Sequence, residues 1–195
     1  TTVAVEATKV RQATTSSDIR AVGSLQSDES VQIASEIAGR ILDIPFKEGQ
    51  PVKDGDVIVR LDEALAKAEV VDAKARLTLA NANNDRARTL SRTGIVTGRS
   101  RDEAVSNFET ANAALELAQT RLNKHTLKAP FNGVAGIRSV SVGAYVGIGV
   151  PLVNIEKIDT LKVDFKVPEI YLEKIKVGQK VEVIVDAIPG KTFDG

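Results

Sequence analysis

The sequence predicts an α+β fold in which a flattened β-sandwich is interrupted by a long antiparallel coiled-coil hairpin. Two observations lead to this fold class. Glycines recur with the same spacing in two stretches that lie 94 residues apart. Between those stretches, residues 52–129 contain no proline and are rich in Ala, Leu, Glu, Lys and Arg, a composition that favours helix. Two strand-rich halves are therefore separated by a helical insertion.

The helical insertion divides into two helices with heptad patterns. The first is expected from Asp62–Glu63 to Arg92, with Asp62 as the N-cap, and the second from Gly98 to His125. The short link at residues 93–96 requires antiparallel neighbours, so the hairpin would be about 45 Å long. A helical pair inside a larger bundle is the alternative, but no further segment has an apolar helical pattern. The residues predicted for the seam are Leu65, Ala68, Asp72, Ala75, Leu79, Ala82 and Arg86 on the first helix, and Ala104, Phe108, Ala111, Leu115, Ala118 and Leu122 on the second.

The two glycine-spaced stretches form an internal repeat. Short runs of β-branched residues, separated by Gly, Pro and Asp-Gly, predict strands and tight turns in both. Glycine at each matched position would supply turn dihedrals that other residues resist. Neither half can close a core alone, so the two must fold together as one sandwich from which the hairpin protrudes. The predicted turn glycines are Gly39, Gly49 and Gly55 in the first half, and Gly133, Gly143 and Gly149 in the second.

Composition excludes several function classes. The 195 residues include 26 Lys and Arg and 26 Asp and Glu, which argues against nucleic-acid binding. There is no Cys, Met or Trp, and aromatic residues make up 4% of the chain, so disulfides, thiolate metal sites and an aromatic-lined pocket are not expected. The single histidine, His125, falls at a helix end, where a structural role is expected. We therefore predict no enzyme activity, no cofactor, no metal and no nucleic-acid partner. The longest apolar stretch, residues 142–153, is too short to span a membrane.

Two segments resemble the halves of biotinyl/lipoyl domains, residues 48–56 and 142–149. Those domains carry a modified lysine on a turn between their halves, whereas here the helical hairpin occupies that place. A split lipoyl domain with an inserted hairpin resembles the periplasmic adaptor family, the membrane fusion proteins of tripartite efflux pumps and type I secretion systems. Residues 127–136 look like the family's return from hairpin to lipoyl domain. Residues 163–169 look like the entry to its β-barrel domain and are most similar to adaptors of resistance-nodulation-division (RND) pumps.

The resemblance implies an elongated, multi-domain chain that needs no chemistry. Such an adaptor would bridge an inner-membrane transporter of the RND type and a TolC-type outer-membrane channel, and would assemble into a ring, expected to be a hexamer. It would lie in the periplasm, attached to the inner membrane through an N-terminal anchor outside this sequence. The implied domains are the first part of a β-barrel (1–31), lipoyl-like half 1 (32–62), the hairpin (63–126), lipoyl-like half 2 (127–156) and an incomplete continuation of the barrel (157–195).

The hairpin tip carries the strongest local charge pattern. Residues 86–101 contain five arginines and no acid. Two of them, Arg99 and Arg101, begin the second helix, where a cation opposes the helix dipole, which suggests a compensating partner. A solvated loop offset by Asp102 and Glu103 is the alternative.

Residues 86–97 resemble the Arg-x-x-x-Leu…Ser/Thr pattern of adaptors that dock a TolC-type channel, with Thr97 in the position usually held by Ser. The resemblance implies three roles. Arg86 would bond channel carbonyls or carboxylates, Leu90 would fill a shallow groove, and Thr97 would add a polar contact while capping the second helix.

Three other functions remain open from the sequence. An adaptor for an ABC-driven exporter or a type I secretion system shares the same plan of lipoyl domain and hairpin. An acyl or biotinyl carrier would need a lysine on a tight turn between the halves. A free-standing coiled-coil scaffold would form its seam between two chains, whereas the adaptor forms it within one.

Overall fold

The computed structural model describes residues 8–10, 18–92 and 97–195. The chain forms two compact units, one of residues 1–26 with 163–195 and one of residues 27–162. Within the described part of the first unit lie a short 3-10 helix, η1 (Glu169–Lys174), and a two-stranded antiparallel sheet of β9 (Glu182–Ile184) and β10 (Thr192–Asp194). None of its described residues is buried. The β-barrel expected from the sequence in this region stays a prediction.

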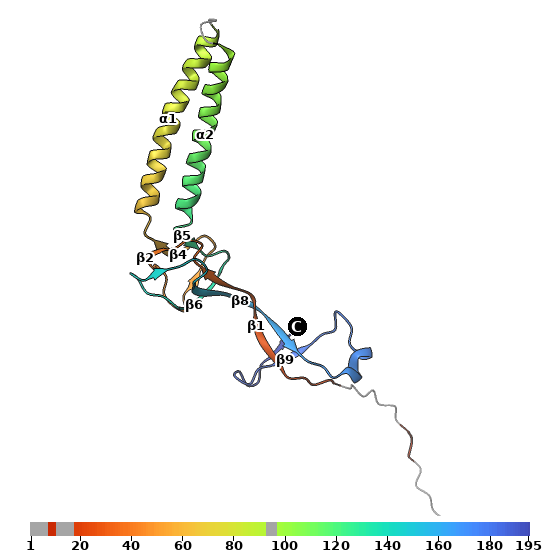
Figure 1. Cartoon of the computed structure of the whole chain (residues 1–195). Helices are drawn as coiled ribbons and strands as arrows, with labels where there is room; N and C mark the ends of the chain where they lie inside the picture. Colours follow the sequence, from red (N-terminus) through yellow and green to blue (C-terminus); the bar gives the residue numbers. More distant parts are fainter. Residues whose placement is uncertain (1–7, 11–17, 93–96) are drawn as a thin grey trace, which may run out of the picture. The chain divides into compact units, whose positions relative to one another are not determined.

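The second unit contains the sandwich and the hairpin (Figure 1). The sandwich has two four-stranded sheets, one in the order β1-β8-β6-β3 and the other in the order β5-β4-β2-β7. The strands are β1 (Gly23–Ala34), β2 (Gly39–Asp43), β3 (Pro51–Val52), β4 (Val57–Leu61), β5 (Thr126–Lys128), β6 (Gly133–Arg138), β7 (Tyr145–Val146) and β8 (Pro151–Phe165).

The two halves exchange strands as the repeat predicts. Strands β2, β3 and β4 begin 94 residues before β6, β7 and β8, respectively. In the two sheets these partners occupy equivalent places: β8 and β6 are the two inner strands of one sheet, and β4 and β2 are the two inner strands of the other. Hydrogen bonds repeat as well: the Gly49 N–H donates to the Ala135 carbonyl at 2.8 Å, and the Gly143 N–H donates to the Ile41 carbonyl at 2.9 Å. Both sheets of the sandwich take strands from both halves, so neither half can close the core alone.

Four of the six repeat glycines have the turn role predicted for them. Their backbone lies in the left-handed region that favours glycine, with φ of 74° at Gly49, 83° at Gly55, 87° at Gly143 and 78° at Gly149. The prediction is wrong for Gly39 and Gly133, which are the first residues of β2 and β6 and have no positive φ. Gly133 instead permits a close approach, since a Cβ there would lie 2.7 Å from the Glu156 carbonyl oxygen of β8.

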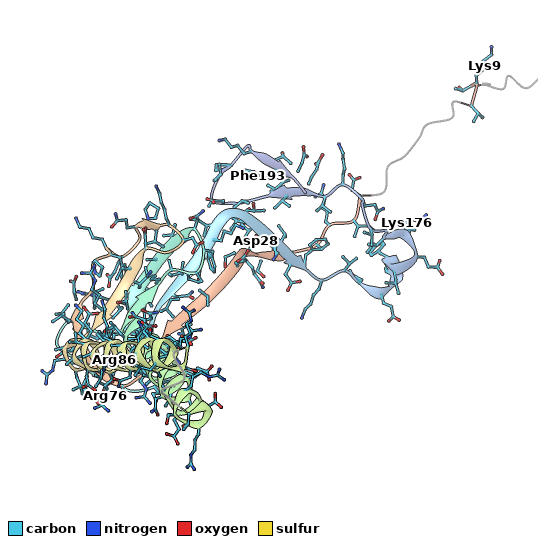
Figure 2. All side chains as sticks on the ribbon, turned by 90° about the horizontal axis from the view of Figure 1, so that it is seen from above. Lys9, Asp28, Arg76, Arg86, Lys176 and Phe193 are labelled. Atoms are coloured by element: carbon cyan, nitrogen blue, oxygen red, sulfur yellow. The ribbon has the colours of Figure 1, made fainter. Side chains whose placement is uncertain are left out.

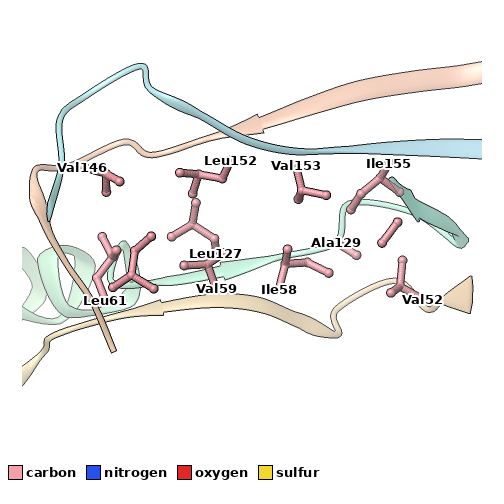
Figure 3. Packing of buried hydrophobic residues seen from close by; sticks show 12 residues of the cluster. Val52, Ile58, Val59, Leu61, Leu127, Ala129, Val146, Leu152, Val153 and Ile155 are labelled. Carbon is pink, nitrogen blue, oxygen red and sulfur yellow. The ribbon is translucent and has the colours of Figure 1, made fainter. Parts of the chain in front are cut away.

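The core of the second unit lies between the two sheets. Figure 3 shows the apolar side chains of β4 and β8 pointing toward one another. Two successive residues are buried on each of these strands, Ile58 with Val59 and Leu152 with Val153. On β4, the pairing with β5 shifts register between Val57 and Val59, an irregularity that breaks strict alternation. The buried cluster consists of Ile41, Val52, Ile58, Val59, Leu61, Leu127, Ala129, Ala135, Val146, Leu152, Val153 and Ile155.

The hairpin consists of α1 (Ala64–Arg92) and α2 (Gly98–Asn123), which lie side by side (Figure 1). Both begin as the sequence predicts: the Asp62 carboxylate accepts a hydrogen bond from the Ala64 N–H at 3.1 Å, and Thr97 is the N-cap of α2. Because the two helices pair within one chain, a scaffold whose seam forms between chains is disfavoured. At the base, Lys124 pairs with Glu36 of the sandwich at 3.1 Å.

The seam of α1 differs from the prediction by a rotation of the helix. All seven predicted seam residues on α1, from Leu65 to Arg86, are exposed. The residues that face α2 follow a second heptad pattern that starts at Ala66, in which every second residue is alanine. The buried or half-buried set is Ala66, Val70, Ala73, Leu77, Ala80, Asn84, Ala87 and Ser91. On α2 the six predicted positions are all buried or half-buried. Alanines at the seam let the helices approach closely, which moves the bulky Leu65 and Leu79 to the outside.

This difference is testable with two leucines on the same helix. Leu77 lies in the seam, whereas the Leu79 residue is 62% exposed. Leu77→Ala is expected to lower the free energy of unfolding by about 2 kcal/mol, since it removes packed apolar surface. Leu79→Ala should change it by less than about 0.5 kcal/mol. Urea unfolding followed by helical circular dichroism checks both values. The observed seam is wrong if Leu79→Ala proves the more damaging substitution.

Candidate docking site at the hairpin tip

The three predicted docking residues all lie near the free end of the hairpin. Arg86 and Leu90 are exposed on the last turns of α1, four residues apart and therefore on one face of the helix. The Leu90 residue is 40% exposed, which argues against a role confined to the hairpin core. Thr97 lies at the start of α2. The connecting residues 93–96 lie outside the described part of the chain.

Arg86 is held along the helix surface by a neighbour. Its guanidinium donates a hydrogen bond to the Asn83 Oδ1, three residues earlier on α1. This bond leaves the other N–H groups of the guanidinium available, since an arginine side chain has five donors. The residue can therefore bind a carboxylate or several carbonyl oxygens of a partner while its own conformation is already restricted.

Thr97 has the capping role predicted for it. Its backbone is extended, with φ of −69° and ψ of 153°, and its Oγ1 accepts a hydrogen bond from the Ser100 N–H at 3.3 Å. The same Oγ1 lies 3.2 Å from the Ser100 hydroxyl. The cap accounts for Thr97 structurally, and its contact with a partner stays a prediction.

The five tip arginines divide into two groups. Arg99 pairs with Glu103 at 3.0 Å, and Arg101 pairs with Asp102 at 3.1 Å, so the offset by nearby acids applies to the two arginines of α2. For the three tip arginines that lie on α1, no carboxylate lies within ion-pair distance among residues 8–10, 18–92 and 97–195. These three are Arg86, Arg88 and Arg92. The uncompensated charge therefore belongs to the end of α1 alone. The i,i+4 spacing of Arg99 and Glu103 could have indicated this from the sequence.

A second charged cluster lies on the sandwich, where β1 runs beside β8 (Figure 2). Asp28 accepts from Lys162 at 2.8 Å and from Lys157 at 3.3 Å, and Lys157 also lies 3.5 Å from Glu29. The hydrogen bonds from Lys162 and Lys157 hold the pKa of the Asp28 carboxyl below its ordinary value. The hydrogen bond with Asp28, followed by the charge of Glu29, raises the pKa of Lys157. Both groups stay charged at neutral pH, and the cluster joins two strands.

The other candidate surface is an open groove of about 420 Å³ at the base of the hairpin. It lies between the end of α2 and two strands that are each at the edge of a sheet, β1 and β5. Seven of its ten lining residues are polar or charged and none is aromatic, so it lacks the aromatic lining that is usual in a ligand pocket. The lining is Gln32, Ile33, Ala34, Glu36, Thr120, Asn123, Lys124, Thr126, Leu127 and Lys128.

Residues 8–10, 18–92 and 97–195 form neither a metal-ligand cluster nor a membrane-spanning helix. No cluster of three His, Asp or Glu side chains among them has the arrangement of a metal site. None of the helices they form is both long enough and apolar enough to cross a bilayer. His125 is half-buried at the end of α2, and its Nδ1 lies 2.9 Å from the Arg121 carbonyl oxygen, a local structural contact.

A split sandwich with a helical hairpin between its halves defines an adaptor-type fold, and the comparisons agree. Residues 29–156 match the family described as RND MFP, barrel-sandwich hybrid domain. The chain therefore belongs to the RND membrane fusion protein family. The multidrug resistance protein MdtA of Proteus mirabilis is 30% identical over 178 residues, which cover 83% of this chain and 43% of that protein.

Solved structures agree with the fold. A putative efflux transporter from Bacteroides eggerthii superposes with a TM-score of 0.75 and 26% identity, over 95% of this chain and 59% of that one. A MacA-MexA chimera containing the Pseudomonas aeruginosa MexA α-hairpin domain gives a TM-score of 0.82 over 91% of this chain and 64% of that one. At 23% identity, the chimera supports the fold alone. The chain spans about half the length of the curated relatives it matches, between 43% and 55% for the first three.

Proposed function

We propose that this chain is part of a periplasmic adaptor of a tripartite efflux pump, which bridges an RND-type inner-membrane transporter and a TolC-type outer-membrane channel. The observation that carries the proposal is the hairpin, whose tip bears three arginines without a carboxylate partner in the described structure. Membership of the RND membrane fusion protein family supports the same function. The adaptor would act in the periplasm, attached to the inner membrane through an N-terminal anchor, and several copies would form a ring, expected to be a hexamer.

The mechanism is mechanical. A helix of 29 residues, such as α1, extends about 43 Å at 1.5 Å per residue, so the hairpin carries its tip far from the sandwich. Arg86 would bind carbonyl or carboxylate oxygens of the channel, Leu90 would enter a shallow apolar groove, and Thr97 would add a polar contact. The exposed positive charge at the end of α1 would steer the hairpin toward an acidic surface. No step requires a catalytic group.

The domain boundaries expected from the sequence are part of the proposal. Residues 32–62 and 127–156 would form the two lipoyl-like halves around the hairpin at 63–126. Residues 1–31 and 157–195 would belong to the barrel domain. The absence of any buried side chain in the described residues of the first unit supports a domain that needs further strands to close its core.

A carrier function has less support. A carrier needs a lysine on a tight turn between the halves, and the chain between β4 and β5 instead contains α1 and α2. Lys53 does lie on a tight turn, but that turn is inside the first half, between β3 and β4, and not between the two halves.

The docking role is testable by photo-cross-linking in cells. A photoreactive amino acid replaces Leu90 in the intact protein, and the same residue replaces Leu117 of α2 as the control, since Leu117 is 52% exposed but lies nearer the base of the hairpin. We expect the channel to cross-link to position 90 and not to position 117. Cross-links to the channel from position 117 alone would contradict the proposed orientation of the hairpin.

A further inference from the structure

The seam of the hairpin contains one buried polar side chain. Asn84 faces α2 from the part of α1 nearer the tip and is 6% exposed. Its Oδ1 is the only buried side-chain oxygen or nitrogen without a hydrogen-bond partner among the described residues. A buried amide oxygen that accepts no bond loses its interaction with water and gains nothing in return, so it destabilises the closed hairpin locally.

Packing in the seam also becomes thinner from this point toward the tip. In the half of α1 next to the sandwich, Val70 and Leu77 supply large side chains to the seam. Beyond Leu77, α1 offers only small or polar seam residues. These are Ala80, Asn84, Ala87 and Ser91. On the α2 side, Val105 and Phe108 are the large half-buried residues at the tip end. Close packing of large apolar residues from both helices is therefore confined to the part near the sandwich.

We propose that Asn84 is a built-in weak point, which lets the tip end of the hairpin open while the part near the sandwich stays closed. The opening segment consists of residues 81–92 and 97–107 and is called the distal segment. Local opening follows regions with few buried apolar contacts, and a buried unpaired amide lowers its cost further. The distal segment includes the three tip arginines of α1 that have no carboxylate partner among the described residues, so its opening changes how their side chains are presented. This inference concerns the hairpin itself and does not rest on the proposed function.

Hydrogen exchange measured by mass spectrometry on the whole chain tests the proposal. Asn84→Leu removes the unpaired amide and adds an apolar side chain to the seam. We expect exchange of the distal segment to slow by about tenfold to a hundredfold, with no change in the amides of residues 66–77. Asn83→Leu is the matched control, since it adds the same side chain to the neighbouring exposed position. In this variant, exchange of the distal segment should slow by less than about threefold.

A second variant keeps the test decisive if leucine does not fit. Asn84→Ala removes the unpaired amide without adding bulk, and it should also slow exchange of the distal segment, by less than Asn84→Leu does. The proposal is overturned if neither variant at position 84 slows the distal segment. It is also overturned if Asn83→Leu slows it as much, or if the whole hairpin slows uniformly, since either result would mean that general helix stability and not the buried amide controls opening.

Discussion

Replacing Ile155 by alanine is expected to lower the free energy of unfolding of the sandwich by about 3 to 5 kcal/mol. Ile155 lies on β8, has no exposed surface, and packs in the cluster between the two sheets. Its truncation loses the transfer free energy of three carbon atoms and leaves a cavity in a core that holds the two halves together. Both halves supply strands to each sheet, so the damage cannot be confined to one of them.

The control for this substitution lies on the neighbouring strand. Ile137 is on β6, which pairs with β8, but the residue is 80% exposed. Ile137→Ala should change the free energy of unfolding by less than about 0.5 kcal/mol. Urea unfolding followed by intrinsic tyrosine fluorescence and circular dichroism measures both variants. A cost below about 1 kcal/mol for Ile155→Ala would contradict a single core shared by the two halves.

Gly133→Ala is expected to cost about 1 to 3 kcal/mol, whereas the same change at its repeat partner, Gly39, should be nearly neutral. A Cβ at position 133 would lie 2.7 Å from the Glu156 carbonyl oxygen, and backbone on both sides must move to admit it. At position 39 the nearest atoms are side-chain carbons of Leu61 at 3.5 Å, an ordinary contact. There, the smaller entropy of the unfolded chain with alanine offsets part of any cost.

The pair of glycine variants tests how far the internal symmetry extends. Thermal unfolding of each purified variant and of the natural chain measures the change in stability at the two positions. An equal loss of stability in Gly133→Ala and Gly39→Ala would mean that both positions need glycine for the same backbone conformation. The structure predicts unequal losses, because β8 lies close against Gly133 while only a side chain approaches Gly39.

Much of the fold is predictable from the sequence because the repeat and the heptads are local patterns. The glycine spacing predicts paired halves, and the proline-free stretch predicts the two helices to within a few residues of their ends. The turn role of Gly39 and Gly133 was wrong, because a glycine at a close approach of strands looks the same in a sequence as one in a turn.

The helix seam shows where pattern reading fails. α1 carries two heptad sets, and both contain large apolar residues: Leu65 and Leu79 belong to the outer set and Leu77 to the seam. Alanine is compatible with both faces of a helix, so its periodicity cannot choose between them. Which face of α1 forms the seam depends on how closely α2 approaches, and this is a property of the tertiary structure. The Asp28 cluster is likewise invisible in the sequence, since it depends on β1 and β8 meeting across more than a hundred residues.

At the tip, the three residues could be identified from the resemblance, and the i,i+4 spacing of Arg99 and Glu103 could have indicated one ion pair. The resemblance to adaptors named Arg86, Leu90 and Thr97, and the structure has Arg86 and Leu90 exposed and Thr97 as a cap. Which arginines keep an uncompensated charge depends on rotamers and neighbouring acids. The docking role of the three residues stays a prediction.

Docking through the hairpin tip is tested by the affinity of this chain for a purified TolC-type channel, before and after Arg86→Asp. The control is Arg121→Asp, which makes the same charge change near the base of the hairpin, where no carboxylate in the described structure pairs with the arginine. We expect Arg86→Asp to weaken binding by about tenfold or more, and Arg121→Asp to change it by less than about threefold. Equal binding by all three folded proteins would contradict docking through the tip.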